Sequence, residues 1–287
     1  MSVINEVCGN ESTQPKNPGG KDQCLEKPVK TVALAKDTFS FPDLATFRTK
    51  AAWLTAINNK DIVPLPNTEN PEENNTEAAI KNGAHKDYTL KDAVAGSNYR
   101  IDAAMCTYEA LKTYQNSEYK RIFEITFAEE VSADIQDDGT VMGRKITSLN
   151  VPLRARATAE DVPFTGVNVK FASDIFSILK TDFEPSELEG VFDVNINQVS
   201  ASSTEIKVTV STACAGSLVS SLEDGDFVVK DGSGDVQSVT FTAADSNGVY
   251  TLTGTGFATG FTVELNGVVA KGNYNYEMVE ALSITVS

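Results

Sequence analysis

Alternation of apolar and polar residues is strictest in the last third of the chain, where it predicts β-strands. In the segment TEIKVTVST, Ile206, Val208 and Val210 face one side of a strand and the polar residues between them face the other. Six further segments predict strands, namely VFDVNINQV, DFVVKDG, VQSVTFTA, GVYTLTG, GFTVELNG and YEMVEALSITVS. Asp-Gly, Ser-Asn-Gly and Asn-Gly sequences lie between strands as turn signals. Seven short strands within residues 191–287 predict an immunoglobulin-like (Ig-like) β-sandwich.

The stretch GVYTLTGTGFATGFTVELNG in this region has almost no titratable side chain. The pattern predicts two strands joined by a turn that contains Gly254, Gly256 and Gly260, with Phe257 packed beneath it. The alternative is a glycine-rich phosphate loop, but GTGFATG is followed neither by a lysine nor by a helix. The stretch therefore favours a scaffold role.

A different period appears in residues 43–58, where apolar residues recur at intervals of three or four and predict one helix. The predicted buried face consists of Leu44, Phe47, Ala51, Leu54 and Ile57. Trp53, the only tryptophan, falls near the edge of this face. Asp43 or Ser40 is the expected N-cap.

The rest of residues 31–190 predicts a β-rich domain, a β-sandwich or barrel. A long hairpin is expected from YKRIFEITFAEEVSADI to MGRKITSLNVPLRARAT, with its turn at Asp138-Gly139. YTLKDA, YRIDAAM and FTGVNVKFAS predict strands, TYEALKTYQN a short helix capped by Thr107, and DIFSILKTDF a helical or turn-like connector. The polar segment 64–83 predicts a long loop, and residues 1–30 predict an extended arm.

The net charge of −16 makes sequence-specific nucleic-acid binding an unexpected function, because phosphate binding relies on clusters of Lys and Arg. Residues 191–287 contain 11 acidic and 3 basic residues, and the last arginine of the chain is Arg156. This shift in composition supports a domain boundary near residue 190. The N-terminus shows no pattern of a secretory signal, and no apolar run is long enough to span a membrane, so we expect a chain that folds in a cytoplasm.

Candidate chemistry is sparse, and we expect no enzyme activity, no catalytic residue, no cofactor and no metal. The single histidine, His85, lies in a polar segment and is expected to be a solvated loop residue. The acidic clusters Glu129-Glu130, Asp137-Asp138 and Glu223-Asp224-x-Asp226 fit no calcium loop and are expected to be solvated turn residues. The tyrosines spread through the first domain, including Tyr99 and Tyr119, are expected to be structural.

The four cysteines, Cys8, Cys24, Cys106 and Cys214, contain no C-x-x-C pair. A zinc site would need thiolates gathered from across the chain. A disulfide between Cys8 and Cys24 is sterically possible, but free thiols are the expectation for a protein that folds in a cytoplasm.

The order of these segments resembles virion proteins of tailed bacteriophages, and tail-tube proteins in particular. The residues that carry the resemblance are the polar arm, FPDLATFRTKAAWLTAI, the polar loop, YKRIFEITFAEEVSADIQDDGTVMGRKITSLNVPLRA and the Ig-like region. It implies a non-enzymatic subunit that forms homo-oligomeric rings around a DNA passage, with an outward Ig-like domain. It also implies other virion proteins as partners, and a location in a virion that is assembled in the host cytoplasm.

Two other non-enzymatic functions remain open from the sequence, besides an acidic hydrolase that would use carboxylates. One is a capsid decoration protein or head–tail connector, which shares the same elements. The other is an Ig-like surface adhesin or carbohydrate-binding protein, and even a virion protein could make weak contact with host-surface glycans through residues 191–287.

Overall fold

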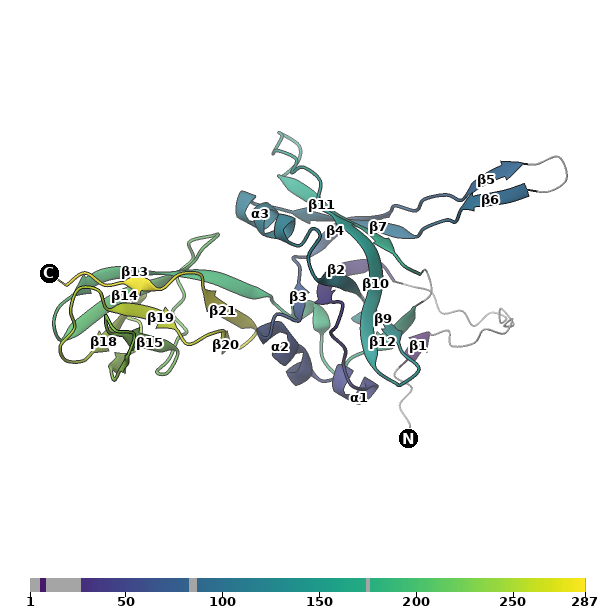
Figure 1. Cartoon of the computed structure of the whole chain (residues 1–287). Coiled ribbons are helices and arrows are strands. Elements are labelled where there is room, and N and C mark those ends of the chain that lie inside the picture. The colour runs from purple at the N-terminus through teal and green to yellow at the C-terminus, as the bar shows by residue number, and fades with distance from the viewer. Residues whose placement is uncertain (1–5, 9–26, 83–86, 174–175, 287) are drawn as a thin grey trace. The chain divides into compact units, whose positions relative to one another are not determined.

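The computed structural model describes residues 6–8, 27–82, 87–173 and 176–286 (Figure 1). The chain divides into two compact units, residues 1–188 and 189–287, and the boundary predicted near residue 190 lies beside this division. Strands make up 47% of the structure and helices 10%, with curled sheets of many strands, so the predicted mostly-β fold is confirmed. No helix in the described ranges is long and apolar enough to cross a membrane.

The first unit combines twelve described strands with three short α-helices and a 3-10 turn, η1 (Pro185–Glu187). Its helices are α1 (Leu44–Phe47), α2 (Lys50–Asn58) and α3 (Met105–Thr113). Its strands are β1 (Glu6–Cys8), β2 (Val29–Lys36), β3 (Ile62–Pro64), β4 (Thr68–Glu73), β5 (Ala79–Asn82), β6 (Asp87–Lys91), β7 (Gly96–Asp102), β8 (Tyr119–Thr126), β9 (Glu130–Ile135), β10 (Val141–Asn150), β11 (Phe164–Phe171) and β12 (Ser177–Lys180).

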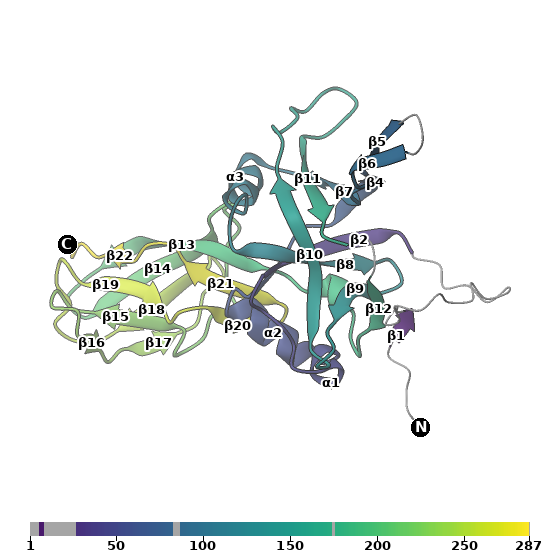
Figure 2. The ribbon, with the colours of Figure 1, turned by 45° about the vertical axis from the view of Figure 1, so that its right-hand side comes forward.

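Ten of these strands form one curled sheet, ordered β1-β12-β9-β8-β10-β11-β7-β4, with β2 paired to β8 and β3 to β2. β10 pairs in turn with β9, β8 and β11 along its length, so it links the two halves of the sheet (Figure 2). β8 lies at the centre, and every residue from Arg121 to Thr126 is buried. The alternation predicted for β8 therefore does not separate a buried face from a solvent face, because neighbouring segments cover both.

Residues 68–82 and 87–102 pair with each other as one long hairpin with two different halves. The inner half joins β4 to β7 inside the large sheet, and the isolated bridge between Thr76 and Val94 continues the pairing outward. The outer half, β5 and β6, is a separate two-stranded sheet (Figure 1). The long loop predicted for residues 64–83 is thus wrong, because β4 and β5 lie within it. Most of the described side chains of β4 and β5 are exposed on both faces of the hairpin. No alternation of apolar and polar residues therefore identifies these segments as strands.

The helix predicted for residues 43–58 is interrupted at Arg48 and Thr49, which separate α1 from α2. The break turns α2 relative to the predicted face, so that Ala51 is exposed and Trp53, expected near the edge, is fully buried. The Trp53 ring packs against four phenylalanines, Phe41, Phe47, Phe123 and Phe183, at centroid distances from 5.1 to 6.2 Å. Of the two expected N-caps, Asp43 is the one that caps α1, since its carboxylate accepts a hydrogen bond from the backbone N–H of Thr46 at 2.6 Å.

Two smaller predictions in the first unit are wrong. Thr107 lies inside α3, which begins at Met105 with Ala104 as its N-cap. The segment expected to be a helical connector contains β12, which pairs with β9 and buries Ile178 and Leu179 in the sheet.

The second unit is a two-sheet sandwich. One sheet has the order β17-β18-β14-β13-β21-β20 and the other β16-β15-β19-β22. The strands are β13 (Val191–Ala201), β14 (Glu205–Thr212), β15 (Phe227–Lys230), β16 (Val236–Gln237), β17 (Thr240–Thr242), β18 (Val249–Thr253), β19 (Thr262–Leu265), β20 (Val269–Lys271), β21 (Tyr274–Met278) and β22 (Leu282–Ser283). Ile206, Val208 and Val210 on β14 all face the core, as their alternation predicts.

The count of seven strands is too low for this unit. The predicted strand VQSVTFTA is divided into β16 and β17, which belong to different sheets, and YEMVEALSITVS is divided into β21 and β22 in the same way. β20 was not predicted. A chain that crosses from one sheet of a sandwich to the other keeps its apolar pattern through the crossing, so the pattern alone shows one strand where there are two.

The glycine-rich stretch of the second unit follows its prediction closely. β18 and β19 lie on either side of the turn, and Phe257 beneath it is 3% exposed. Gly254 allows this packing, because a Cβ at that position would stand 2.5 Å from the Phe257 ring. Gly256 and Gly260 have positive φ values of 76° and 97°, which explains why the turn needs glycine there.

The expectation of free thiols is wrong for Cys106 and Cys214, which are both disulfide-bonded. The prediction was based on the cellular compartment, whereas a disulfide depends on which sulfur atoms the fold brings together. Cys24 lies outside the described residues, as does most of the predicted arm.

Candidate functional site

A cluster of three polar side chains occupies the interior of the first unit. Tyr99 on β7, Glu124 on β8 and Arg144 on β10 are 0%, 3% and 5% exposed. The Tyr99 hydroxyl donates a hydrogen bond to Glu124 Oε1 at 2.5 Å, and the Arg144 guanidinium forms an ion pair with Glu124 Oε2. The strands that carry these three residues are separated in the sequence, and it is their position in one β-sheet that brings the side chains together.

Two phenylalanines enclose the arginine of this cluster. The guanidinium carbon of Arg144 lies 3.8 Å from the ring centroids of both Phe171 and Phe176, which is a cation–π contact on two sides. Burial, and then the nearby carboxylate of Glu124, raises the pKa of Tyr99 well above its ordinary value. Tyr99 therefore remains a protonated donor at neutral pH and is unsuited to act as a general base.

A cavity of about 420 Å³ opens onto this cluster. Its floor includes Tyr99, Glu124 and Arg144, and its rim includes Glu72 and Glu73. A buried ion pair that is also hydrogen-bonded needs no ligand to compensate its charges. We interpret the cluster as a structural network inside the sheet.

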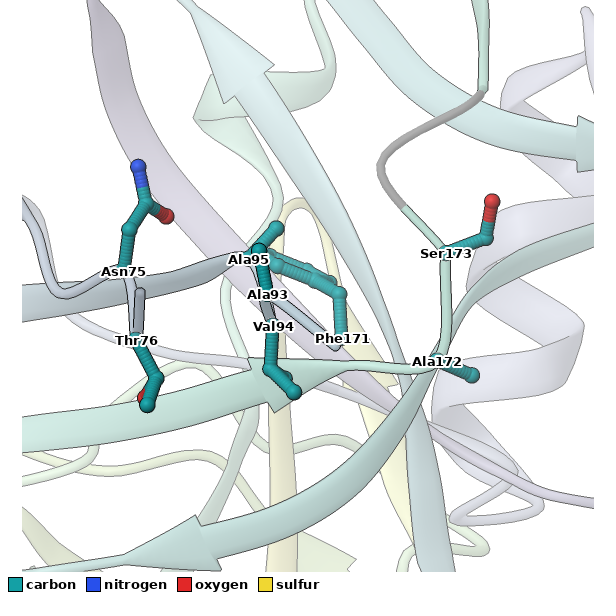
Figure 3. A pocket seen from close by; sticks show the side chains of 8 residues that line it. All are labelled: Asn75, Thr76, Ala93, Val94, Ala95, Phe171, Ala172 and Ser173. Atoms are coloured by element: carbon teal, nitrogen blue, oxygen red, sulfur yellow. The ribbon is translucent and has the colours of Figure 1, made fainter. Parts of the chain in front are cut away.

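A second cavity, of about 360 Å³, lies where the long hairpin leaves the large sheet (Figure 3). Asn75 and Thr76 line it on one strand, and Ala93, Val94 and Ala95 on the other. The Asn75 side chain accepts a hydrogen bond from the backbone N–H of Gly96 at 3.0 Å and so ties the strands together at this point. The lining holds no titratable group, and the cavity is a packing feature at the base of the outer half of the hairpin.

The outer half of the long hairpin consists of β5 and β6, and its described side chains are exposed; we call these two strands the hairpin end. Ile80 is 59% exposed, and Lys81, Thr89 and Lys91 are also exposed. β5 and β6 pair with each other and with no further strand in the described part of the chain. An isolated two-stranded hairpin is only marginally stable in water, and packing against another surface stabilises such a hairpin. The hairpin end is a segment of this type.

A third cavity, of about 320 Å³, lies on the outer face of β4, β7 and β11. Glu72 and Arg100 line this cavity, and the carboxylates of Glu69, Asp102 and Asp161 lie near Arg100; we call these four carboxylates the acidic face. Arg100 is the cation among them; it pairs with Asp161 at 2.5 Å, and its pKa is raised by that hydrogen bond and by the nearby carboxylates of Asp102 and Glu69. Four carboxylates around one guanidinium leave this surface negative.

Most of the acidic residues that the sequence suggested as candidates for catalysis or metal binding have structural roles. Glu129 accepts hydrogen bonds from Ser186, Glu130 pairs with Lys180, and the Asp138 carboxylate accepts from the backbone N–H of Thr140 in a turn. Glu223 and Asp226 both contact the Lys271 ammonium. Within the described ranges, no three His, Cys, Asp or Glu residues gather as a metal site would require. His85 lies outside those ranges.

Sequence reasoning missed the interior cluster and the two surfaces for different reasons. Glu124 interrupts an apolar strand, which is a signal of its own, but nothing near it in sequence identifies Arg144 or Tyr99 as its partners. The acidic face combines three separate segments, so only the strand register reveals it. No family model and no curated protein sequence matches this chain.

Proposed function

We propose that the protein is a non-enzymatic structural subunit that self-associates, and that it serves in a virion as a phage tail-tube-type protein. The observation that carries the proposal is the hairpin end, an exposed two-stranded sheet that extends from the curled sheet of the first unit. A subunit that reaches a neighbour with such an element forms heterologous contacts, which close into rings when the rotation between copies permits.

Two further observations support a structural role. Tyr99, Glu124 and Arg144 inside the first unit are paired with each other, and the described residues hold no cluster of three His, Cys, Asp or Glu that could bind a metal ion. The second unit is a sandwich of short strands with an apolar core, which suits an appended module. As a tail-tube-type subunit, the protein would bind copies of itself and other virion proteins and would assemble in the host cytoplasm.

The experiment is a comparison of the full chain with a variant that lacks the hairpin end. Replacing residues 77–93 by an Asn-Gly turn keeps the backbone pair Thr76 and Val94, whose N–H groups bond each other's carbonyl at 2.8 and 3.0 Å, as the closing pair of a hairpin. Sedimentation velocity and negative-stain microscopy should show rings or tubes for the full chain. The variant should remain a folded monomer with an unchanged near-ultraviolet circular dichroism spectrum.

Two results would contradict the proposal. One is a full chain that stays monomeric at the highest concentration it tolerates. The other is a variant that assembles as well as the full chain, which would move the contact to another surface.

A further inference from the structure

A row of polar side chains crosses four strands of the large sheet. Glu72 on β4 is the cross-strand partner of Asn98 on β7, which is in turn the partner of Asn168 on β11. Asn168 pairs with Asn150 on β10. Cross-strand partners project from the same face of a sheet. Tyr99, which follows Asn98, belongs to the buried core, so the row lies on the opposite, outer face.

Two oxygen atoms in this row are buried and lack a hydrogen-bond partner among the described residues. They are Oδ1 of Asn98 and Oδ1 of Asn168. The third asparagine of the row is satisfied, because Asn150 Oδ1 accepts a hydrogen bond from Gln115 Nε2 at 2.9 Å. A buried acceptor without a donor is costly to a folded protein. Both unpaired asparagines line the cavity of about 320 Å³, which indicates that this cavity receives a group with hydrogen-bond donors.

Gly166 keeps the space between these two oxygens open. It lies on β11, two residues before Asn168, and it lines the same cavity. A Cβ on Gly166 would stand 2.6 Å from Asn98 Oδ1 and 3.4 Å from Asn168 Oδ1. Any other residue would therefore fill the point where the oxygens converge. A strand glycine at such a place permits the close approach of another group, and one small group with several donors can bond to both oxygens there.

The charges around the cavity favour a cationic group. Glu72 lines the cavity, is exposed, and has no hydrogen-bond or ion-pair partner in the described part of the chain. Arg100 also lines the cavity, but Asp161 pairs with it, and the carboxylates of Asp102 and Glu69 lie near it. Negative charges thus outnumber positive ones at this surface, which attracts a cation.

A primary ammonium group matches the site in charge and in number of bonds. It carries three N–H donors and no acceptor, and the site offers three acceptors, namely the two asparagine oxygens and the Glu72 carboxylate. A calcium ion fits less well, because it usually takes about six to eight oxygen ligands. Within the described ranges, no three acidic, histidine or cysteine side chains gather around a point as a metal ion would require.

Apolar side chains stand beside these acceptors. Pro152, Leu153 and Phe164 line the same cavity, and Leu153 is 87% exposed. The Arg100 guanidinium covers one face of the Phe164 ring, with its carbon 3.9 Å from the ring centroid. An alkyl chain can lie along such a surface while the charged group at its end bonds to polar atoms. The group that fits best is therefore an ammonium at the end of an alkyl chain.

We propose that this cavity binds a primary alkylammonium group, whose N–H donors bond to Asn98 Oδ1, Asn168 Oδ1 and the Glu72 carboxylate. A free amine and a lysine side chain of a second copy present the same group. The inference goes beyond the proposed function, because the cavity can bind an amine whether or not the chain self-associates.

The test is a titration of the full chain with butylammonium, followed by NMR of the backbone amide groups. We expect saturable shift changes in β7 and β11, around Asn98 and Asn168. Butyltrimethylammonium has the same charge and the same alkyl chain but no N–H donor, and it should bind about tenfold more weakly or less, because it forms no hydrogen bond. Equal affinity for the two cations would show attraction to an acidic surface only, and would overturn the inference.

Two variants locate the bound amine. Asn98→Leu removes one acceptor and should weaken butylammonium binding by about tenfold. Glu72→Gln removes the charge at an exposed position, where no core packing is disturbed, and should also weaken binding. Glu280→Gln is the matched control, since it makes the same change at an exposed site of the second unit and should leave the affinity unchanged. Full affinity in both Asn98→Leu and Glu72→Gln would overturn the inference.

Sedimentation velocity with and without butylammonium distinguishes the two sources of the amine. If butylammonium dissociates assemblies of the chain and butyltrimethylammonium does not, the occupant is a lysine of a second copy. If butylammonium binds and assembly is unchanged, the occupant is a free amine. A chain that never associates contradicts the proposed function and leaves the amine titration intact as a test. Absence of saturable butylammonium binding overturns this inference in every case.

Discussion

The two units of this protein build β-sheet cores in different ways. The second unit has an almost entirely apolar core, in which the buried hydroxyl of Tyr250 links Val219 and Leu222. The first unit buries charged groups, among them Glu124, Arg144 and Arg121, inside its curled sheet. The difference teaches that a sandwich of alternating strands can be specified locally. A large curled sheet with strands covered on both faces depends on pairing between distant polar residues.

The strongest test of this contrast is removal of the Trp53 side chain in the first unit. Trp53→Ala should lower the free energy of unfolding of that unit by about 3–5 kcal/mol, because it leaves a cavity among four phenylalanines. The substitution also removes the hydrogen bond from Trp53 Nε1 to the Phe47 carbonyl at 2.7 Å. Hydrogen exchange followed by mass spectrometry measures the two units separately within the full chain.

The matched control for this variant is Thr55→Ala on the same helix. Thr55 is exposed, and we expect a change below about 0.5 kcal/mol. Equal acceleration of exchange in both units by Trp53→Ala would show that they do not unfold as separate structures.

The next largest effect is expected from the interior ion pair. Glu124→Ala should destabilise the first unit by about 3 kcal/mol, because it leaves the buried Arg144 without its counter-charge. Replacing both residues by apolar ones, as in Glu124→Leu with Arg144→Met, should recover most of this loss. Chemical denaturation monitored by Trp53 fluorescence measures both variants, and a double variant less stable than the single one would contradict this account.

In the second unit, the comparable test is the hydroxyl of Tyr250. It donates a hydrogen bond to the Val219 carbonyl at 2.8 Å and accepts one from the Leu222 N–H at 3.1 Å. Tyr250→Phe leaves both backbone groups unpaired and should cost about 2 kcal/mol in the second unit alone. Tyr274→Phe is the control, since Tyr274 is 49% exposed, and hydrogen exchange in peptides of residues 189–287 gives the comparison.

The smallest predicted effect concerns pH and Glu129, in the turn between β8 and β9. Burial raises the pKa of Glu129, but the hydrogen bonds from Ser186 and the Lys30 ammonium lower it by more than burial raises it. The pKa of Glu129 therefore lies below its ordinary value. A carboxyl group with a lowered pKa stabilises the folded state above its unfolded pKa of about 4.3, and this contribution is lost as the pH falls through the folded value.

Glu129→Gln should therefore destabilise the first unit at neutral pH by less than about 1 kcal/mol, and the difference should vanish in acid. Denaturation of both proteins at a series of pH values tests this directly. A difference that stays constant down to acid pH would mean that the charge of Glu129 does not contribute.

Several elements could be predicted from the sequence because local interactions define them. The alternation in β14 places Ile206, Val208 and Val210 in the core, and the turn glycines of 254–260 locate β18 and β19. The Asp43 cap is equally local, since cap and recipient are three residues apart. In each case, the residues that decide the structure are neighbours in the chain.

Other features were decided only by the tertiary structure. The polar residues of β4 form a strand because the backbone of β7 pairs with them. The order of side chains in β4 does not by itself predict a strand. Trp53 became the centre of an aromatic cluster because the helix breaks at Arg48, and because Phe123 and Phe183 from distant segments meet Phe41 and Phe47 there. The interior cluster formed by Tyr99, Glu124 and Arg144 depends on strand pairing, which brings together side chains that are far apart in the sequence. The same is true of the acidic face. The sequence by itself determined where strands and turns can form, and the long-range pairing of backbone groups determined which surfaces they build.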